Sequence, residues 1–320
     1  MITEIIEPSP LSVLILAFLI DIILGEPPAA LHPVVIIGKA VDRLRRMVPR
    51  RKISGLVISL VVITGAVLAG VALIRIAYAL GDLLAGHRLM GDLLALIFSS
   101  YLLKSTFAFR SLISTSREIG RLIDEDLDAA KRLLPALVSR NPLNLTHAQA
   151  RSAVIESLSE NYVDTIVSPL FYYVIFSYFG LGVEAALAFK AVSTMDSMLG
   201  YRTEELREIG YVPARLDDIL NWIPARLSLP LIMIASPTKA QDILRACMRY
   251  RSVTPSPNSG WPMAAAAGAL GTRMEKPGVY TILDEGRDPE SEDISSAISL
   301  IGRAMMLAAV LSAVLLIPLG

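Results

Sequence analysis

Cysteine is almost absent from this chain, since Cys247 is the only one among 320 residues. A single thiol cannot form an intramolecular disulfide, a zinc site built from several thiolates or a cysteine-ligated cluster. We therefore expect Cys247 to behave as an ordinary small apolar residue.

An excess of either charge is also absent, because 30 lysines and arginines balance 30 aspartates and glutamates. Nucleic-acid-binding proteins use a broad positive field to collect phosphates, so we expect no nucleic-acid partner. The chain also has no G-x-x-x-x-G-K-[ST] phosphate loop, no G-x-G-x-x-G dinucleotide motif and no H-E-x-x-H zinc helix. Any nucleotide must therefore bind at a less common kind of site.

Apolar residues are abundant instead: they make up 53% of the chain, and the mean hydropathy is +0.55. These values exceed those of an ordinary soluble domain. We predict an all-α, polytopic integral membrane protein in which amphipathic and cytosol-facing helices lie between the spans, with residues 1–320 forming one domain. A bilayer needs about 20 apolar residues per helix. The predicted spans are about residues 11–24, 55–80, 91–109 and 297–319, with a broken or re-entrant apolar segment at 165–192.

Basic residues cluster between the first two spans, where residues 39–52 hold seven lysines and arginines against the single acid Asp42. By the positive-inside rule this loop is cytoplasmic, and the cluster itself is interpreted as an orientation signal that contacts anionic lipid. Counting the crossings from there places the long polar middle of the chain in the cytosol. We expect a multi-pass cell-membrane protein whose active loops, about residues 110–164, 193–226 and 236–296, face the cytoplasm.

Three carboxylates, Glu156, Glu160 and Asp164, stand four residues apart. On an α-helix this spacing puts them on one arc roughly 80° wide. Like charges at this spacing destabilise a helix by a few tenths of a kcal/mol per pair, which a bound cation or arginines would offset. The alternative is a solvated acidic face.

A second cluster lies in residues 214–226, where Asp217 and Asn221 share a helix face and Arg215 reaches Asp218. Hard oxygen ligands suit Mg²⁺, and guanidinium groups suit phosphate or carboxylate. The residue types fit nucleotide-dependent activation of a carboxylate, whereas an internal ion pair at a membrane surface is the other interpretation.

Two loops complete the candidate chemistry. Residues 256–262, Ser-Pro-Asn-Ser-Gly-Trp-Pro, combine a rigid φ at proline with the close backbone approach that glycine permits. Residues 21–27 carry Asp21 and Glu26 at the end of an apolar run, followed by His32. A functional site and side chains that reach toward the interface are equally compatible with this second loop.

In order and spacing these segments resemble the adenosylcobinamide-phosphate synthase family of cobalamin biosynthesis, the CobD/CbiB family, over nearly the whole chain. One departure is Ser139-Arg140-Asn141, where the family pattern has Gly-Arg-Asp, so that the arginine is kept and the acid is lost. The resembling segments are Asp21 to Pro27, His32-Pro33-Val34, Glu156 to Asn161 with Asp164, Ser168 to Tyr172, Asp196 to Tyr201, Ala214 to Asp218, Pro224-Ala-Arg226 and Ser256 to Pro262.

The resemblance implies an acid–amine ligase that joins (R)-1-amino-2-propanol or its O-phosphate to a propionate of adenosylcobyric acid. It implies ATP and Mg²⁺ as co-substrates, with the corrinoid as substrate, and other enzymes of cobalamin assembly as candidate partners. The implied catalytic residues are Glu156, Glu160, Asp164, Asp217 and Asp218, of which Glu160, Asp217 and Asp218 are the hypothetical Mg²⁺ ligands. The implied substrate-binding residues are His32, Arg140, Asn161, Arg215, Arg226 and Asn258.

Two other classes of protein stay open. A membrane transporter would use broken apolar segments and charges near the spans, although the charged clusters here concentrate in the predicted cytosolic loops. A noncatalytic scaffold for corrinoid enzymes would not explain carboxylate and arginine clusters tied to Pro and Gly loops. Hydrolysis of ATP that depends on a corrinoid would separate the ligase from both.

Overall fold

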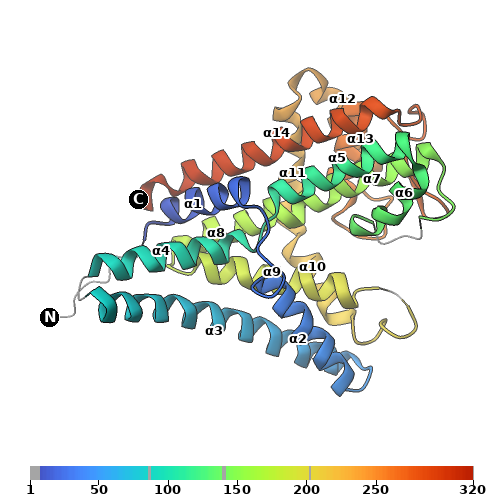
Figure 1. Cartoon of the computed structure of the whole chain (residues 1–320). Helices are drawn as coiled ribbons and strands as arrows, with labels where there is room; N and C mark the ends of the chain where they lie inside the picture. The colour runs from blue at the N-terminus through green and yellow to red at the C-terminus, as the bar shows by residue number, and fades with distance from the viewer. Residues whose placement is uncertain (1–7, 86–87, 139–141, 202, 320) are drawn as a thin grey trace. The chain divides into compact units, whose positions relative to one another are not determined.

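The computed structural model describes residues 8–85, 88–138, 142–201 and 203–319 (Figure 1). Within these ranges the chain is almost entirely helical, which confirms the all-α prediction. The strands found in the same ranges are β1 (Met274–Lys276) and β2 (Tyr280–Ile282), an antiparallel pair in which Glu275 faces Thr281.

The chain folds into two compact units. The first unit contains Met1–Ala108, Pro169–Leu220 and Val310–Gly320, and the second contains Phe109–Ser168 and Asn221–Ala309. Both units therefore combine segments that are distant in the sequence.

The first unit is built mainly from long helices, and α3 and α4 lie side by side (Figure 1). They are α1 (Pro10–Ile23), α2 (Pro33–Met47), α3 (Lys52–Ala85), α4 (Arg88–Lys104), α8 (Ser168–Ser177), α9 (Gly182–Leu199) and α10 (Tyr211–Leu220), with the short turn η4 (Ile317–Leu319).

Helices α2, α3 and α9 share one apolar core in the first unit. Val41, Ile58 and Met195 are buried at its centre, one from each helix. On α3, a Cβ atom added to Gly55 would lie 2.1 Å from the carbonyl oxygen of Ile209, so only glycine permits this close approach. Ile209 therefore lies directly against the start of α3.

Among the described residues, three helices are long and apolar enough to cross a membrane, or four if α10 and α11 (Trp222–Ala235) form one span. The three are Lys52–Gly81, Leu89–Glu125 and Ser291–Leu319, and they make this a membrane protein. The helix α1 has only 14 residues, about 21 Å at 1.5 Å per residue, whereas the hydrocarbon core is about 30 Å thick. The crossing at residues 11–24 stays a prediction, as does the cytoplasmic orientation.

The segment predicted as broken is interrupted at two places. A π-helical turn, η2 (Val163–Val167), precedes α8, and Gly180 has a φ of 71° between α8 and α9. This left-handed conformation is easily adopted by glycine, because it has no Cβ. The glycine at position 180 therefore permits the break between α8 and α9.

The second unit surrounds the alanine-rich helix α13, whose residues Met263 to Gly268 are all buried. Helices α7, α11 and α12 pack against α13, and the β1–β2 hairpin joins α7 and α13. The helices of this unit are α5 (Phe109–Glu125), α6 (Leu127–Leu133), η1 (Leu134–Ala136), α7 (His147–Tyr162), η2, α11 (Trp222–Ala235), η3 (Pro237–Lys239), α12 (Ala240–Tyr250), α13 (Gly260–Leu270) and α14 (Ser291–Leu316), whose last residues belong to the first unit.

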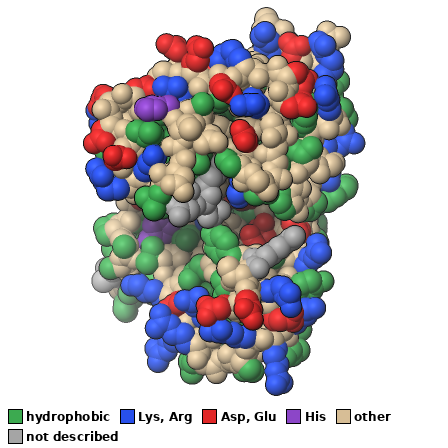
Figure 2. All heavy atoms as spheres, turned by 90° about the vertical axis from the view of Figure 1, so that its right-hand side faces the viewer, with side chains coloured by type: hydrophobic (Ala, Val, Ile, Leu, Met, Phe, Trp, Pro, Cys, Tyr) green, Lys and Arg blue, Asp and Glu red, His purple; other side chains and the backbone are tan. Residues whose placement is uncertain are grey.

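The basic cluster of residues 39–52 lies where α2 ends and α3 begins, and Lys and Arg side chains gather in the lower part of Figure 2. Within the cluster, Asp42 accepts hydrogen bonds from Arg45 at 2.8 Å and from Arg46 at 2.5 Å. Because Asp42 offsets only one positive charge, the cluster keeps the net positive charge that the positive-inside rule requires.

Candidate functional site

The acidic helix α7 starts at a capping box. The Thr146 hydroxyl accepts from the Gln149 amide, and the Gln149 side chain accepts from the Thr146 amide, which satisfies two otherwise unpaired donors. The cap fixes where α7 begins and hence which side chains turn inward.

Glu156 is fully buried at the centre of a hydrogen-bond network. One carboxylate oxygen accepts from the Ser152 hydroxyl at 2.6 Å, and the other accepts from the Tyr280 hydroxyl at 2.7 Å. The Ser152 hydroxyl in turn accepts from the Glu275 amide at 2.8 Å. Glu156 therefore ties α7 to the hairpin, and the solvated-face interpretation does not hold for it.

Glu160, Asn161 and Asp164 are half-buried. Asp164 lies in the π-helical turn η2 and not in a continuous α-helix. A π-helix has more residues per turn than an α-helix, and regular α-helical geometry ends at Tyr162, before Asp164. Such turns occur often at functional sites, and the sequence carries no simple signal for them.

Arg226 on α11 lies among aromatic rings and polar oxygens. Its guanidinium lies 4.0 Å from the centroid of the Trp222 ring and 4.9 Å from that of the Trp261 ring. It donates hydrogen bonds to the Trp222 carbonyl at 2.6 Å and to the Asn258 side-chain oxygen at 3.3 Å. The predicted residues Arg226 and Asn258 thus meet in one place, although 32 positions separate them.

The sequence interpretation missed two members of this group. Arg251 lies 5.1 Å from the centroid of the Trp261 ring, so two guanidinium groups share one indole. The side chain of Trp222 is half exposed and carries the other contact to Arg226. The signal that could have found Arg251 is its position five residues before Ser256, at the start of the Pro-rich loop. Paired guanidinium groups on rigid aromatic rings form a surface suited to an anion.

The sole cysteine lies close to Trp261 and Arg251, but its thiol is unreactive. Cys247 is buried, and its thiol donates to the Trp261 carbonyl at 3.6 Å. Burial raises the pKa of Cys247 to about 11, more than the nearby Arg251 lowers it. A neutral thiol is a poor nucleophile, which agrees with its expected role as a packing residue.

In the first unit, α10 carries Arg215, Asp217 and Asp218. Arg215 contacts Asp218 at 3.4 Å, as the three-residue spacing predicted. Burial, with a further contribution from the Asp218 charge, raises the pKa of Asp196 to about 6. The carboxylates of α9 and α10 therefore interact, and Asp196 joins the candidate residues although the sequence interpretation gave it no role.

A buried charge network lies between α1 and α4 in the same unit. The Lys104 ammonium contacts Asp21 at 2.8 Å and Glu26 at 3.0 Å, and neither Lys104 nor Asp21 has an exposed side chain. The network balances one cation against two carboxylates, and Glu26 is its exposed member.

His32 adds a further hydrogen-bond partner to the network. Its Nδ1 atom accepts from the Val34 amide at 3.2 Å, so Nε2 carries the proton and donates to Glu26 at 3.1 Å. Burial raises the pKa of Glu26, but the His32 hydrogen bond and the Lys104 charge outweigh it, so the pKa lies below its usual value. Glu26 is therefore a stable carboxylate and a weak base.

The candidate residues divide between the two units. Glu156, Glu160, Asn161, Asp164, Arg226 and Asn258 belong to the second unit, and His32, Arg215, Asp217 and Asp218 belong to the first. Arg140 lies outside the described residues. The predicted Mg²⁺ ligands Glu160, Asp217 and Asp218 thus come from both units.

Among the described residues, no group of three or more His, Cys, Asp or Glu side chains could hold a metal ion. Magnesium bound with a nucleotide needs only one or two protein carboxylates, because phosphates and water supply the other ligands. Asp196 and Asp218 supply two carboxylates of that kind in the first unit, whereas a cage built from protein side chains alone does not fit the described residues.

A profile of the CobD/CbiB protein family matches residues 14–301. The chain is 86% identical over 319 residues to a protein of Methanothrix thermoacetophila named probable cobalamin biosynthesis protein CobD, and the alignment covers all of both chains. It is 38% identical over 302 residues to the protein of that name from Methanothermobacter thermautotrophicus, covering 93% of this chain and 95% of the relative. It is 36% identical over 307 residues to the cobalamin biosynthesis protein CobD of Dehalococcoides mccartyi, covering 92% and 93%. No solved structure matches the chain. The extent of these matches shows that the chain belongs to the CobD/CbiB family of cobalamin biosynthesis proteins.

Proposed function

We propose that this protein is an adenosylcobinamide-phosphate synthase, a membrane ligase that forms an amide bond in cobalamin biosynthesis. Its substrates would be adenosylcobyric acid, ATP and either (R)-1-amino-2-propanol or its O-phosphate. The observation that carries the proposal is family membership over residues 14–301. The arginines Arg226 and Arg251 and the carboxylates Asp196 and Asp218 are the residue types that such a reaction needs.

A carboxylate is a poor acyl donor, so the reaction must first give it a leaving group. The terminal phosphoryl group of ATP would pass to a propionate oxygen, which yields an acyl phosphate and ADP. The amine nitrogen then attacks the acyl carbon, the carbon–oxygen bond to phosphate breaks, and phosphate and a proton are released. Phosphoryl transfer of this kind is catalysed largely by positioning and by charge stabilisation.

The second unit supplies the anion-binding residues in this proposal. Arg226 and Arg251 would bind the phosphate or the corrinoid carboxylate, because both guanidinium groups lie against the Trp261 ring. Asn258 holds Arg226 in place through its side-chain oxygen. Glu160 and Asp164 would orient the amine by accepting hydrogen bonds from its ammonium form. Glu156 would act as a positioning residue, since Ser152 and Tyr280 occupy its oxygens.

The first unit supplies the nucleotide-binding residues. Asp218, with Asp196 and Asp217, would hold Mg²⁺, and this ion would neutralise phosphate charge when the nucleotide is bound. Arg215 reaches Asp218 and would orient it. His32 and Glu26 would form a polar surface for a substrate.

The test is a ligation assay on the purified protein in detergent. It would be incubated with adenosylcobyric acid, ATP, Mg²⁺ and either amine, and the corrinoid mass would be followed. A gain equal to the amine minus water would support the ligase, and the preferred amine would identify the substrate. No product with either amine, from folded protein that still binds the corrinoid, would overturn the proposal in favour of a transporter or a scaffold.

The residue assignment is tested separately from the activity. Glu160→Ala and Asp217→Ala should abolish ligation without changing membrane insertion. The matched control is Glu205→Ala, whose carboxylate is exposed and paired with Arg50 at 3.4 Å. Full activity of both Glu160→Ala and Asp217→Ala would contradict the assignment.

The active loops would face the cytoplasm of the cell, where ATP is available. The positive-inside rule applied to residues 39–52 supports this orientation. A cysteine introduced at Arg50 should react with an impermeant thiol reagent only after the cell is opened, since Cys247 is buried. Labelling of this cysteine in intact cells would show that the loop faces the outside of the cell and would contradict the proposed orientation.

A further inference from the structure

The second unit has a groove of about 690 Å³ between α5 and the first part of α14. The helices run antiparallel, because Ile113 meets Gly302 at one end and Gly120 meets Ile294 toward the other. The lining of the groove includes Arg117, Arg121, Asp124, Ser295, Ser299 and Arg303.

The groove carries an excess of positive charge. Three guanidinium groups line it, those of Arg117, Arg121 and Arg303, against one lining carboxylate, Asp124. Arg121 is paired with Glu125, so Arg117 and Arg303 carry the positive charge that is left for a ligand. Asp124 accepts from Arg151 at 2.6 Å and from the Ser291 hydroxyl, so its charge is already compensated. An anion is therefore the complementary ligand for the groove.

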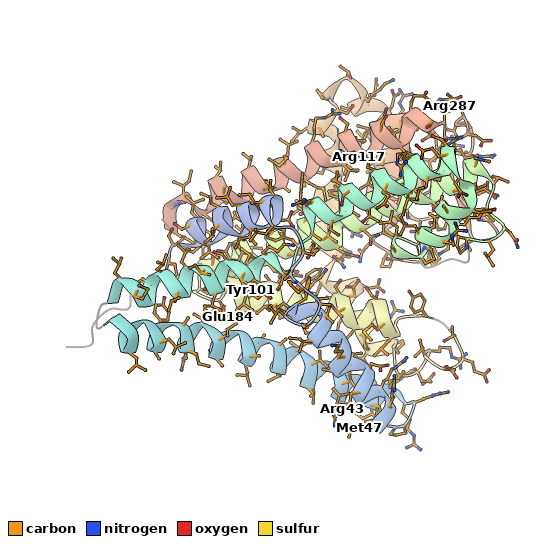
Figure 3. The ribbon with its side chains drawn as sticks, viewed as in Figure 1. Arg43, Met47, Tyr101, Arg117, Glu184 and Arg287 are labelled. Atoms are coloured by element: carbon orange, nitrogen blue, oxygen red, sulfur yellow. The ribbon has the colours of Figure 1, made fainter. Side chains whose placement is uncertain are left out.

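Arg303 is held in a fixed position at one end. Its Nε donates to the Ala235 carbonyl at 2.9 Å, and its Nη1 donates to the Ser299 hydroxyl at 2.9 Å. A guanidinium has five N–H donors, so three remain for a ligand. Arg117 projects from α5 beside α14 (Figure 3) and makes no hydrogen bond or ion pair with any residue that the structure describes.

The Arg303 end of the groove meets the apolar part of α14. Every residue after Arg303 is uncharged, from Ala304 to Gly320, and the stretch Ser291–Leu319 is long and apolar enough to cross a membrane. The Met306 side chain next to Arg303 is exposed. Arg303 lies within the stretch Ser291–Leu319, so its long side chain would reach along the helix toward the lipid head groups. The groove thus has a cationic wall, and at Arg303 it adjoins the apolar part of α14.

We propose that this groove binds one anionic phospholipid of the surrounding bilayer. The phosphate is held by Arg117 and Arg303, the head group lies among Ser295 and Ser299, and the acyl chains follow the exposed apolar face of α14 beyond Arg303. The proposal is independent of the ligase reaction, because none of these residues belongs to the catalytic or substrate-binding set.

Native mass spectrometry of the protein, released from vesicles of phosphatidylglycerol and phosphatidylcholine, tests this proposal. We expect one phosphatidylglycerol to be retained. Arg117→Gln should weaken its retention about tenfold, the effect of one charge-assisted hydrogen bond. The matched control is Arg245→Gln, an exposed arginine on α12 that pairs with Asp242 at 2.7 Å, and it should retain lipid like the unchanged protein. Arg303→Gln should also lose the lipid. If Arg303→Gln does not fold, Arg117→Gln still tests the proposal.

Three results would overturn the proposal. Equal retention of phosphatidylcholine would exclude recognition of the anionic head group. Competition by millimolar inorganic phosphate or glycerol phosphate would make the groove a site for a soluble phosphate. Retention unchanged in folded Arg117→Gln would place the lipid elsewhere.

Discussion

Replacing Lys104 by methionine is the most informative perturbation of the first unit. Lys104 has no exposed side-chain surface, and its ammonium contacts Asp21 at 2.8 Å, Glu26 at 3.0 Å and the Phe107 carbonyl at 3.3 Å. Methionine has a similar length and fills the same space. The change therefore removes the charge while largely preserving the packing.

The cost follows from what is left behind. Asp21 is also fully buried, so without Lys104 it becomes a buried carboxylate that has lost its contact with the ammonium group. Removing one partner of a buried ion pair costs about 3–5 kcal/mol. For a protein of this size that loss lowers the midpoint of thermal unfolding by on the order of 10 °C.

The assay is thermal unfolding of the purified protein in detergent, with the double variant Lys104→Met and Asp21→Asn as the comparison. Neutralising Asp21 as well should recover most of the lost stability, because replacing both members of a buried pair is often nearly neutral. A loss below about 1 kcal/mol for Lys104→Met, or no recovery in the double variant, would refute a role for this ion pair.

Three further predictions concern the candidate site. Tyr280→Phe leaves one oxygen of buried Glu156 without the Tyr280 hydroxyl and should cost about 1–3 kcal/mol in thermal unfolding; no change would mean that water replaces the hydroxyl. Because the pKa of Asp196 is raised from 3.8 to about 6, the folded state binds more protons between these values, and stability should fall as pH rises from 4 through 6. The fall amounts to about 3 kcal/mol at most, and unfolding midpoints of Asp196→Asn should not show it. Arg226→Lys keeps the charge but loses the planar group that stacks on two indoles, so the KM for ATP or the corrinoid should rise about tenfold, whereas Arg245→Lys should leave both unchanged.

Much of the fold could be predicted from local sequence. The apolar run at residues 55–80 lies within α3, and residues 297–319 lie within α14 and η4. A single long apolar segment in a bilayer satisfies its backbone hydrogen bonds as a helix. The break before residue 182 was likewise indicated by Gly180. The hairpin at Met274–Ile282 was not predicted, since two strands of three residues leave almost no periodic signal.

In the candidate site, too, contacts within one helix could be predicted and contacts between distant segments could not. Ion pairs within one helix, such as Arg215 with Asp218, could be predicted because three residues nearly complete one turn. The pairing of Arg226 with Arg251 through Trp261 could not, because it depends on where α11, α12 and the loop before α13 come together. The buried state of Glu156 was also hidden, since its donor Tyr280 lies 124 positions away.

The sequence by itself determined the membrane class, the helical architecture and the family, because these rest on composition, helix-length apolar runs and the order of short motifs. Only the tertiary structure decided how the charges are placed: Lys104 lies against Asp21, Glu156 accepts from two hydroxyl donors, and Arg226 and Arg251 share the ring of Trp261. The physical reason is that burial and pairing depend on contacts between distant segments, whereas helix formation depends on neighbours within a few turns.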